Sequence, residues 1–129
     1  MIRCVRLFSS PDGNSHFEDG FIDMPLSQRG DILSGATDVK TVSFRETGIG
    51  GEFEWHNDPT PQYVITLSGV LEFEMKGGEK FTINPGDILL ATDTTGTGHR
   101  WRILDGNPWR RMYVVLKDGQ TSIGFKSGK

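Results

Sequence analysis

Apolar and polar residues alternate along most of this 129-residue chain. In runs such as QYVITLSG, VLEFEMK and HRWRIL an apolar residue recurs at about every second position, which is typical of β-strands with one buried face. Glycine, proline, asparagine and aspartate separate these runs at intervals of roughly ten residues, as turns do. The pattern predicts an all-β protein, an antiparallel sandwich or barrel of about nine or ten short strands.

The alternating runs give the position of each expected strand. They cover residues 2–8, 15–24, 40–47, 51–56, 62–69, 70–76, 80–87, 88–92, 99–104 and 109–117, with a weak candidate at 122–125. Residues 25–39 show neither alternation nor a helical stripe, and we interpret them as irregular. Because no repeat, low-complexity segment or linker interrupts the pattern, we expect residues 1–129 to form one domain.

The composition narrows the function classes. Hydrophobic residues make up 35% of the chain and charged residues 24%, as in soluble globular proteins. The net charge is -3 and the pI about 5.5, which argues against a nucleic-acid partner because backbone binding needs a concentrated basic surface. Four arginines gather late in the chain: Arg100, Arg102, Arg110 and Arg111. Their alternation favours a solvated face with ion pairs; the other interpretation is an anion site for a small molecule.

The single cysteine and the first residues of the chain indicate in which compartment to expect the protein. Cys4 is the only cysteine, so no internal disulfide is possible, and its run IRCVRLF favours a small buried residue over a nucleophile. The first residues lack the continuous apolar region of a signal peptide, and no apolar run approaches the ~18 residues that a membrane span needs. We expect a cytoplasmic protein without membrane contact.

Strict alternation also assigns side chains to faces. In residues 51–56 it places Glu54 and His56 on one face and Phe53 on the other. In residues 99–104 it places His99 and Trp101 together. A histidine on a strand of a small barrel points either into the cavity or to solvent, and an inward charged group must be paired or hold a metal.

Five residues between positions 50 and 69 keep a recognisable spacing. Gly50 is followed by five residues and His56, Asp58 stands two further on, Gln62 follows after three residues, and Gly69 after six more. This resembles the first motif of the cupin superfamily, in which the last four positions are His, His, Glu and Gly. Here Asp58 replaces the second histidine and Gln62 the glutamate.

A second run, NPGDILLATDTTGTGH, resembles the second cupin motif. Pro85 and Gly86 match its opening turn, and Gly96 and His99 match its closing Gly-x-x-His, whereas Ile103 takes the place of an asparagine. The resemblance covers roughly residues 42–116. It implies a double-stranded β-helix, the jelly-roll barrel of cupins, and leaves the activity open because this fold serves many chemistries.

The resemblance implies a divalent metal inside the barrel, with iron, manganese, nickel or zinc as candidates. The ligand candidates carried over by position are His56, Asp58, Gln62 and His99. Asp58 also fits a turn-capping role in NDP. His16, the third histidine, either completes a three-histidine site or is an ordinary surface residue.

Two classes of function remain open. The first is a metal-dependent enzyme acting on a small organic substrate, as a dioxygenase, isomerase or lyase, through His56 and His99. The alternative is a metal-free cupin that serves as a ligand-binding or regulatory module, or as an acid–base isomerase or cyclase. In the acid–base case the catalytic candidates are His56 with Glu54 or Asp58. Small cupins commonly pair through sheet edges, so the expected partners are a small molecule and a second copy in a homodimer.

Overall fold

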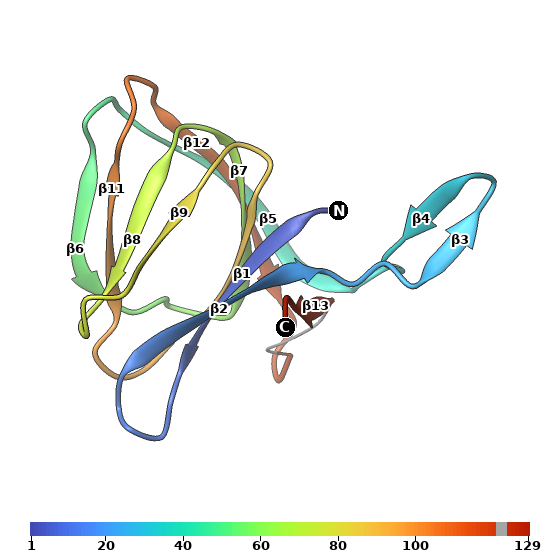
Figure 1. The fold of residues 1–129 in the computed structure, drawn as a ribbon, viewed down its shortest axis with the longest axis horizontal. Helices are drawn as coiled ribbons and strands as arrows, with labels where there is room; N and C mark the ends of the chain where they lie inside the picture. Colours follow the sequence, from blue (N-terminus) through green and yellow to red (C-terminus); the bar gives the residue numbers. More distant parts are fainter. Residues whose placement is uncertain (121–123) are drawn as a thin grey trace.

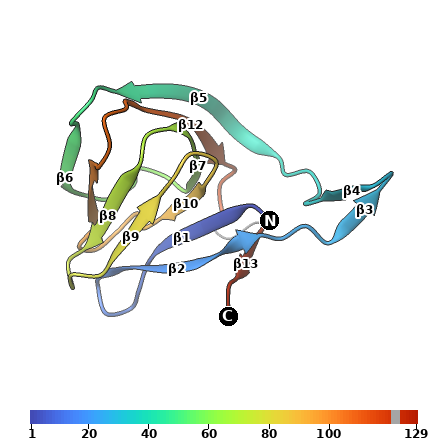
Figure 2. The same ribbon diagram turned by 45° about the horizontal axis from the view of Figure 1, so that its top comes forward.

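Two facing β-sheets form the body of the protein. The computed structural model describes residues 1–120 and 124–129. A seven-stranded sheet runs in the order β13-β2-β1-β10-β7-β12-β5, and a four-stranded sheet in the order β6-β11-β8-β9. Figures 1 and 2 show the second sheet lying across the first. The all-β jelly-roll barrel predicted from the sequence is therefore confirmed.

The strands coincide closely with the alternating runs. Their bounds are β1 Arg3–Ser9, β2 Ser15–Ile22, β3 Leu26–Gln28, β4 Asp31–Leu33, β5 Val39–Thr47, β6 Glu52–His56, β7 Gln62–Ser68, β8 Leu71–Met75, β9 Lys80–Ile83, β10 Ile88–Thr92, β11 His99–Ile103, β12 Trp109–Leu116 and β13 Phe125–Ser127. The weak candidate at 122–125 lies largely outside the described residues. All pairings between the strands are antiparallel except that of β1 with β10, which is parallel. No helix among the described residues is long and apolar enough to cross a membrane.

The interpretation of residues 25–39 as irregular is wrong in part. Within them β3 and β4 pair as a two-stranded hairpin that stands away from the two sheets (Figure 1). The hairpin closes at Arg29 and Gly30, which both have positive φ. It leaves Leu26 and Ile32 exposed, and three-residue strands are too short to show a period of two.

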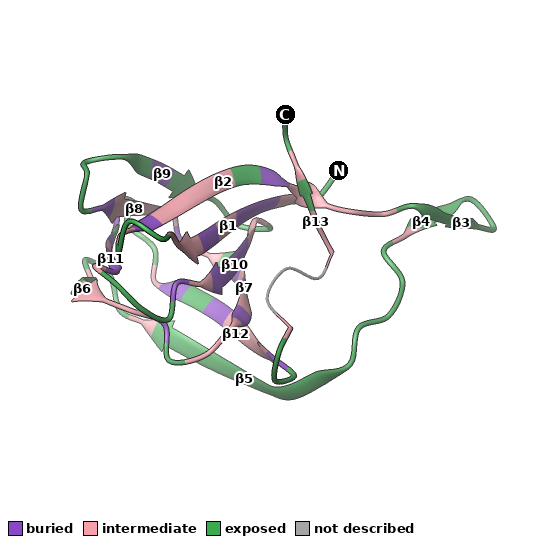
Figure 3. Cartoon of the chain, turned by 90° about the horizontal axis from the view of Figure 1, so that it is seen from below, coloured by how far each residue is buried: buried purple, intermediate pink, exposed green. Residues whose placement is uncertain are grey.

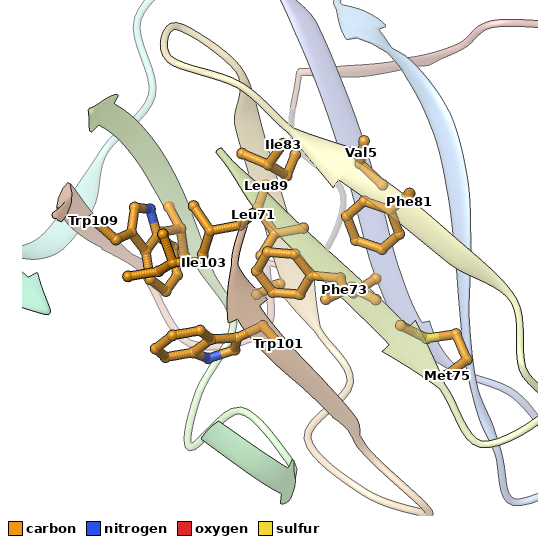
Figure 4. Packing of buried hydrophobic residues seen from close by; sticks show 13 residues of the cluster. Val5, Leu71, Phe73, Met75, Phe81, Ile83, Leu89, Trp101, Ile103 and Trp109 are labelled. Atoms are coloured by element: carbon orange, nitrogen blue, oxygen red, sulfur yellow. The ribbon is translucent and has the colours of Figure 1, made fainter. Parts of the chain in front are cut away.

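The main core lies between the two sheets. Side chains from both pack there, and Figure 4 shows the aromatic rings of Phe73, Phe81, Trp101 and Trp109 among aliphatic residues. The rings of Trp101 and Trp109 meet edge to face with centroids 4.7 Å apart, a favoured geometry for aromatic pairs. The prediction that His99 and Trp101 share a face of their strand is confirmed, because both are buried, as is Ile103.

A smaller cluster covers the outer face of the seven-stranded sheet. Cys4, Leu90 and Leu116 are buried there, with Phe125 of β13 packed against them. Burial raises the pKa of the Cys4 thiol to about 12, which keeps it protonated. Cys4 is therefore a small buried hydrophobic residue, as the alternation predicts.

The edge strand β5 differs from the rest of the barrel. All of its residues except the last are exposed, and Figure 3 shows this strand exposed along nearly its whole length. It pairs with β12 on one side only. One face of β5 turns toward the barrel interior and the other carries Val42 and Phe44 into solvent.

Candidate functional site

The barrel encloses a cavity of about 480 Å³ between the two sheets. Aromatic and aliphatic walls surround a smaller number of polar and charged groups, which is the usual make-up of a small-molecule site. The lining residues are Ser43, Arg45, Phe53, His56, Asn57, Asp58, Pro59, Thr60, Gln62, Val64, Phe73, Leu89, His99, Trp101, Trp109, Arg111, Tyr113 and Val115. The structure thus brings His56, Asp58, Gln62 and His99 to one cavity.

A β-bulge turns His56 into this cavity. In the pairing of β6 with β11, His56 lies opposite His99 and Phe53 opposite Trp101, so two residues of β6 face one residue of β11. His56 consequently lies on the same side as Phe53, and their rings stack with centroids 4.2 Å apart. The assignment of His56 and Phe53 to opposite faces is wrong, because the extra residue shifts the alternation by one.

A hydrogen bond to the backbone determines which nitrogen of the His56 ring carries the proton. Its Nδ1 lies 2.7 Å from the backbone oxygen of Glu54, so this nitrogen carries the proton and donates. Burial lowers the pKa of His56, and the proximity of His99 acts in the same direction. The neutral ring therefore has its lone pair on Nε2.

His99 is fixed by a buried carboxylate. Its Nδ1 lies 2.6 Å from Oδ2 of Asp93, and both side chains are sealed from solvent. The hydroxyl of Ser15 donates to the same oxygen over 2.8 Å. Burial alone would raise the pKa of Asp93, but the hydrogen bonds from His99, Asp58 and Ser15 outweigh it and the pKa is lowered. Asp93 is thus ionised and holds the proton on Nδ1 of His99.

Asp58 completes this buried chain in its protonated form. It is 8% exposed and lines the cavity beside Asp93. Burial, together with a hydrogen bond to Asp93 and the charge of that carboxylate, raises the pKa of Asp58 to about 10. Apart from the bond between the two carboxyl groups, Oδ2 of Asp58 and Oδ1 of Asp93 have no hydrogen-bond partner among the described residues.

The same side chains could hold a metal ion. Ligand atoms of Asp58, Asp93 and His99 lie within 4.8 Å of one another, and all three residues are buried. The ring of His56 adjoins that of His99, with centroids 4.6 Å apart. Gln62, which is 6% exposed, adds an amide to the cavity wall.

Glycine at position 98 allows the close approach that seats His99. Gly98 has a φ of 74°, in the left-handed region, and a Cβ there would collide with the backbone carbonyl of His56. The loop before it is tied to the β1–β2 turn, since the N–H of Thr97 donates to Gly13 over 3.1 Å. The Gly-x-x-His element of the sequence therefore positions both imidazoles.

Two predicted site residues lie elsewhere. The side chain of Glu54 faces solvent on the outside of the four-stranded sheet, 3.7 Å from Arg100, and only its backbone oxygen serves His56. His16 lies 2.8 Å from Asp12 near the protein surface and does not line the cavity. The structure therefore does not bring Glu54 or His16 to His56 and His99.

The late arginines divide between the two faces. Arg100, Arg102 and Arg110 lie outside and form ion pairs with glutamates, as the solvated-face interpretation predicts. Arg111 instead lies inside the barrel and is 3% exposed. Its strand begins WRRMY, so a period of two from the buried Trp109 is the signal that places Arg111 inward.

Two further polar residues lie inside the barrel, and the sequence around them gives less indication of that position. Ser15 binds Asp93 from a distant strand, and nothing in its local sequence indicates this. Arg45 lines the cavity from β5, where it alternates with the outward Phe44.

No family model matches the chain, but several curated proteins do. It is 28% identical over 92 residues to the oryzines biosynthesis cluster protein J of Aspergillus oryzae, covering 71% of this chain and 48% of that protein. It is 28% identical over 91 residues to the phomopsin biosynthesis cluster protein D of Diaporthe leptostromiformis, covering 70% and 45%. It is 33% identical over 81 residues to the cupin-domain-containing oxidoreductase srdD of Neurospora crassa, covering 60% and 38%. The chain thus spans less than half the length of these relatives.

Two solved structures are also similar. A DUF861 family protein of Thermotoga maritima has 27% identity and a TM-score of 0.48, with 57% of this chain and 77% of that chain covered. A Streptococcus pyogenes protein of unknown function has 18% identity and a TM-score of 0.46, with 61% and 65% covered. Motif spacing, the two facing sheets and the similarity to a curated cupin-domain protein support a small cupin domain.

Proposed function

We propose that this protein is a metal-dependent enzyme of the cupin type that acts on a small organic substrate in the barrel cavity. The observation that carries the proposal is the state of the two adjacent imidazoles. His56 and His99 each commit Nδ1 to an acceptor, the Glu54 carbonyl and the Asp93 carboxylate. Each therefore has Nε2 as the nitrogen for a further partner, and both rings line the cavity.

The donor set fits a divalent first-row metal. Imidazole nitrogen with carboxylate and amide oxygen suits iron, manganese, nickel and zinc. His56 and His99 would hold the metal through Nε2, with Gln62 and the carboxyl of Asp58 as the oxygen donors. Asp93 would not be a ligand in this arrangement, because its bond to Nδ1 is the outer contact that fixes the tautomer of a metal-binding histidine. A bound metal supplies Lewis-acid polarisation of a substrate oxygen, or oxygen chemistry where it is redox-active.

The chain's own residues would orient the substrate and exclude water. Trp101, Trp109 and Phe53 provide aromatic walls for an organic molecule. The Neurospora relative is named an oxidoreductase, which favours an oxidative reaction among the dioxygenase, isomerase and lyase alternatives. The relatives named for biosynthesis clusters are consistent with a small-molecule substrate.

A metal-free acid–base enzyme is the second candidate. It is favoured by the hydrogen-bonded chain from Asp58 through Asp93 to His99, in which a carboxylate orients an imidazole as it does for a general base. The lowered pKa of His56 keeps that ring neutral, so Nε2 is ready to accept a proton from a substrate. In this case Asp58 retains its proton instead of binding a metal.

Elemental mass spectrometry of protein purified without chelator or histidine tag tests the metal. We expect about one divalent metal per chain in the wild type and its loss in His56→Ala and in His99→Ala. His16→Ala is the matched control, because it removes the remaining histidine of the chain at a site outside the cavity. Wild-type protein that binds none of the four metals after reconstitution would contradict the metal enzyme and leave the acid–base candidate.

A further inference from the structure

Two guanidinium groups face the cavity without a carboxylate partner. Arg45 and Arg111 both line it, and neither forms an ion pair among the described residues. The neighbouring Arg110, by contrast, points outward and lies 3.0 Å from Glu46. The protein thus neutralises the arginine on its outer face and leaves the inner pair unneutralised.

Arg111 is held rigidly in this position. Its Nε donates to the Tyr113 hydroxyl over 3.2 Å, and its Nη1 donates to the Thr47 hydroxyl over 2.8 Å and to the Trp109 carbonyl over 3.0 Å. The guanidinium also lies 3.8 Å above the centre of the Trp109 ring. These contacts are all to neutral groups, so they orient the cation without cancelling its charge.

One nitrogen of this guanidinium has no partner. Nη2 of Arg111 makes no hydrogen bond among the described residues, and it is not among the atoms sealed from solvent. A buried guanidinium stays protonated, and it is costly to bury one without an anion. The free nitrogen, on a side chain that is 3% exposed, therefore points to a missing negative partner.

The rest of the cavity does not supply that partner. Among the described lining residues the single acidic side chain is Asp58. Asp58 is hydrogen-bonded to the buried Asp93, and among the described residues it forms no ion pair with Arg45 or Arg111. The guanidinium of Arg45 lies 4.9 Å from the centre of the Tyr113 ring, and that of Arg111 lies 5.6 Å from it, so two positive charges flank one side chain.

We propose that the cavity binds the carboxylate of an organic acid, with Nη2 of Arg111 donating to one of its oxygens and Arg45 supplying a second positive charge. This names the substrate class of the enzyme proposed above, and it rests on that proposal. The flat aromatic walls of Trp101 and Trp109 would pack against the organic part of the molecule. A carboxylate suits this site better than a phosphate, because one free guanidinium nitrogen and one flanking cation offer few donors for three oxygens.

Matched acids and amides test the charge requirement. The probes are acetate, benzoate and hexanoate, each beside its own amide, titrated into ¹⁵N-labelled protein and followed by nuclear magnetic resonance. We expect at least one acid to bind saturably and at least tenfold more tightly than its amide. The indole signals of Trp101 and Trp109 should move, whereas that of Trp55 should not, since Trp55 lies outside the cavity against Lys76 and Arg100.

Three substitutions assign the binding to the arginines. Arg111→Gln and Arg45→Gln should each weaken acid binding at least tenfold, and Arg110→Gln should leave it within twofold. Arg45 is exposed, so its variant stays informative even where loss of the buried Arg111 disturbs the fold. Equal binding of acids and amides, or unchanged affinity in Arg45→Gln, would overturn the proposal. Tighter binding of inorganic phosphate at the same arginines would overturn the assignment to a carboxylate.

Acid binding measured without metal distinguishes the carboxylate site from the proposed metal enzyme. Acid binding to the metal-free wild type and to His56→Ala should persist, because among the described residues no hydrogen bond or ring contact joins His56 to either arginine. Wild-type protein that binds acids but none of the four metals would contradict the metal enzyme alone. Retained metal binding without any preference for acids would contradict the carboxylate site alone.

Discussion

Nδ1 of His99 and Oδ2 of Asp93 lie 2.6 Å apart in a part of the barrel closed to solvent. A hydrogen bond to an ionised carboxylate is about twice as strong as a neutral one, and burial strengthens it further. The pair settles which nitrogen of His99 faces the cavity. Every chemical use of His99 therefore depends on Asp93, although Asp93 itself does not line the cavity.

Asp93→Asn should weaken the preference of the His99 ring for carrying its proton on Nδ1. The amide can accept from Nδ1 but no longer carries the charge that favours the proton there, so both tautomers of His99 become populated. We expect the ¹⁵N spectrum of the imidazole to show the mixture, and divalent metal affinity to fall about 10–100-fold.

The surface pair of Asp12 and His16 is the matched control for Asp93→Asn. It has the same kind of contact, over 2.8 Å, in a solvent-exposed setting. Asp12→Asn should leave metal affinity unchanged. Metal affinity that is equally unaffected in Asp93→Asn would show that the buried carboxylate does not tune His99.

The raised pKa of Asp58 predicts that the folded protein becomes less stable as the pH rises. The pKa of this carboxyl group rises from an ordinary 3.8 to about 10 on folding, so the folded state holds a proton that the unfolded state releases. This contribution to stability is complete below pH 3.8 and is lost as the pH rises toward 10. Over that window the free energy of unfolding should fall as the pH rises, because the unfolded chain releases a proton that the folded chain keeps.

Asp58→Asn should remove that dependence. The amide has the shape of the protonated acid and can donate to Asp93, but it does not titrate. In metal-free protein held in chelator, the melting temperature of the variant should exceed that of the wild type by a margin that grows from pH 5 to pH 9. Asp38→Asn, which changes a carboxylate 86% exposed at the surface, should run parallel to the wild type. A parallel profile for Asp58→Asn would mean that Asp58 is ionised in the folded protein.

The strands and much of the cavity could be predicted because each depends on a local period. Alternation places His99 and Trp101 inside, since β11 runs regularly along its partner β8. The spacing of the cupin-like motifs brings His56 and Gln62 to the same cavity. These features need no knowledge of what lies across the barrel.

The remaining features depend on contacts between distant segments. The bulge before His56 reverses its face, and the run EFEWH contains no glycine to mark it. Asp93 lies on the loop before β11, and its bond to Ser15 joins residues far apart in the chain. Alternation from the buried Trp109 places Arg111 on the inner face of β12. A sequence prediction would normally reject that position, because it buries a positive charge without a carboxylate partner.

Gly98→Ala should destabilise the fold and disturb both imidazoles. A side chain at a φ of 74° costs about 1–2 kcal/mol, and its Cβ would also press on the His56 carbonyl. We expect a loss of roughly 2–3 kcal/mol in the free energy of unfolding, measured by urea denaturation. Gly106→Ala is the control, because a Cβ there meets nothing within 4 Å, and a similar loss in both variants would exclude a specific role for Gly98.

The homodimer expected from the sequence remains a prediction, and β5 offers a surface for it. This nine-residue strand ends the seven-stranded sheet, so one side of its backbone has no partner strand. Phe44 projects from it with 71% of its side chain exposed, and Leu67 of β7 is 56% exposed nearby in the same shallow hollow. A long edge strand with exposed apolar side chains favours pairing with another strand, and a second copy of this chain provides one.

Light scattering after size exclusion measures the mass directly. We expect about twice the 14.4 kDa of the chain for the wild type and a shift to the monomer for Phe44→Glu, because a charge at the centre of the contact cannot be buried without a partner. Ile49→Glu places the same charge at a residue 70% exposed in the turn beyond β5, and it should remain dimeric. A wild-type mass of 14.4 kDa at micromolar concentration would contradict the dimer and leave β5 as a free edge beside the cavity.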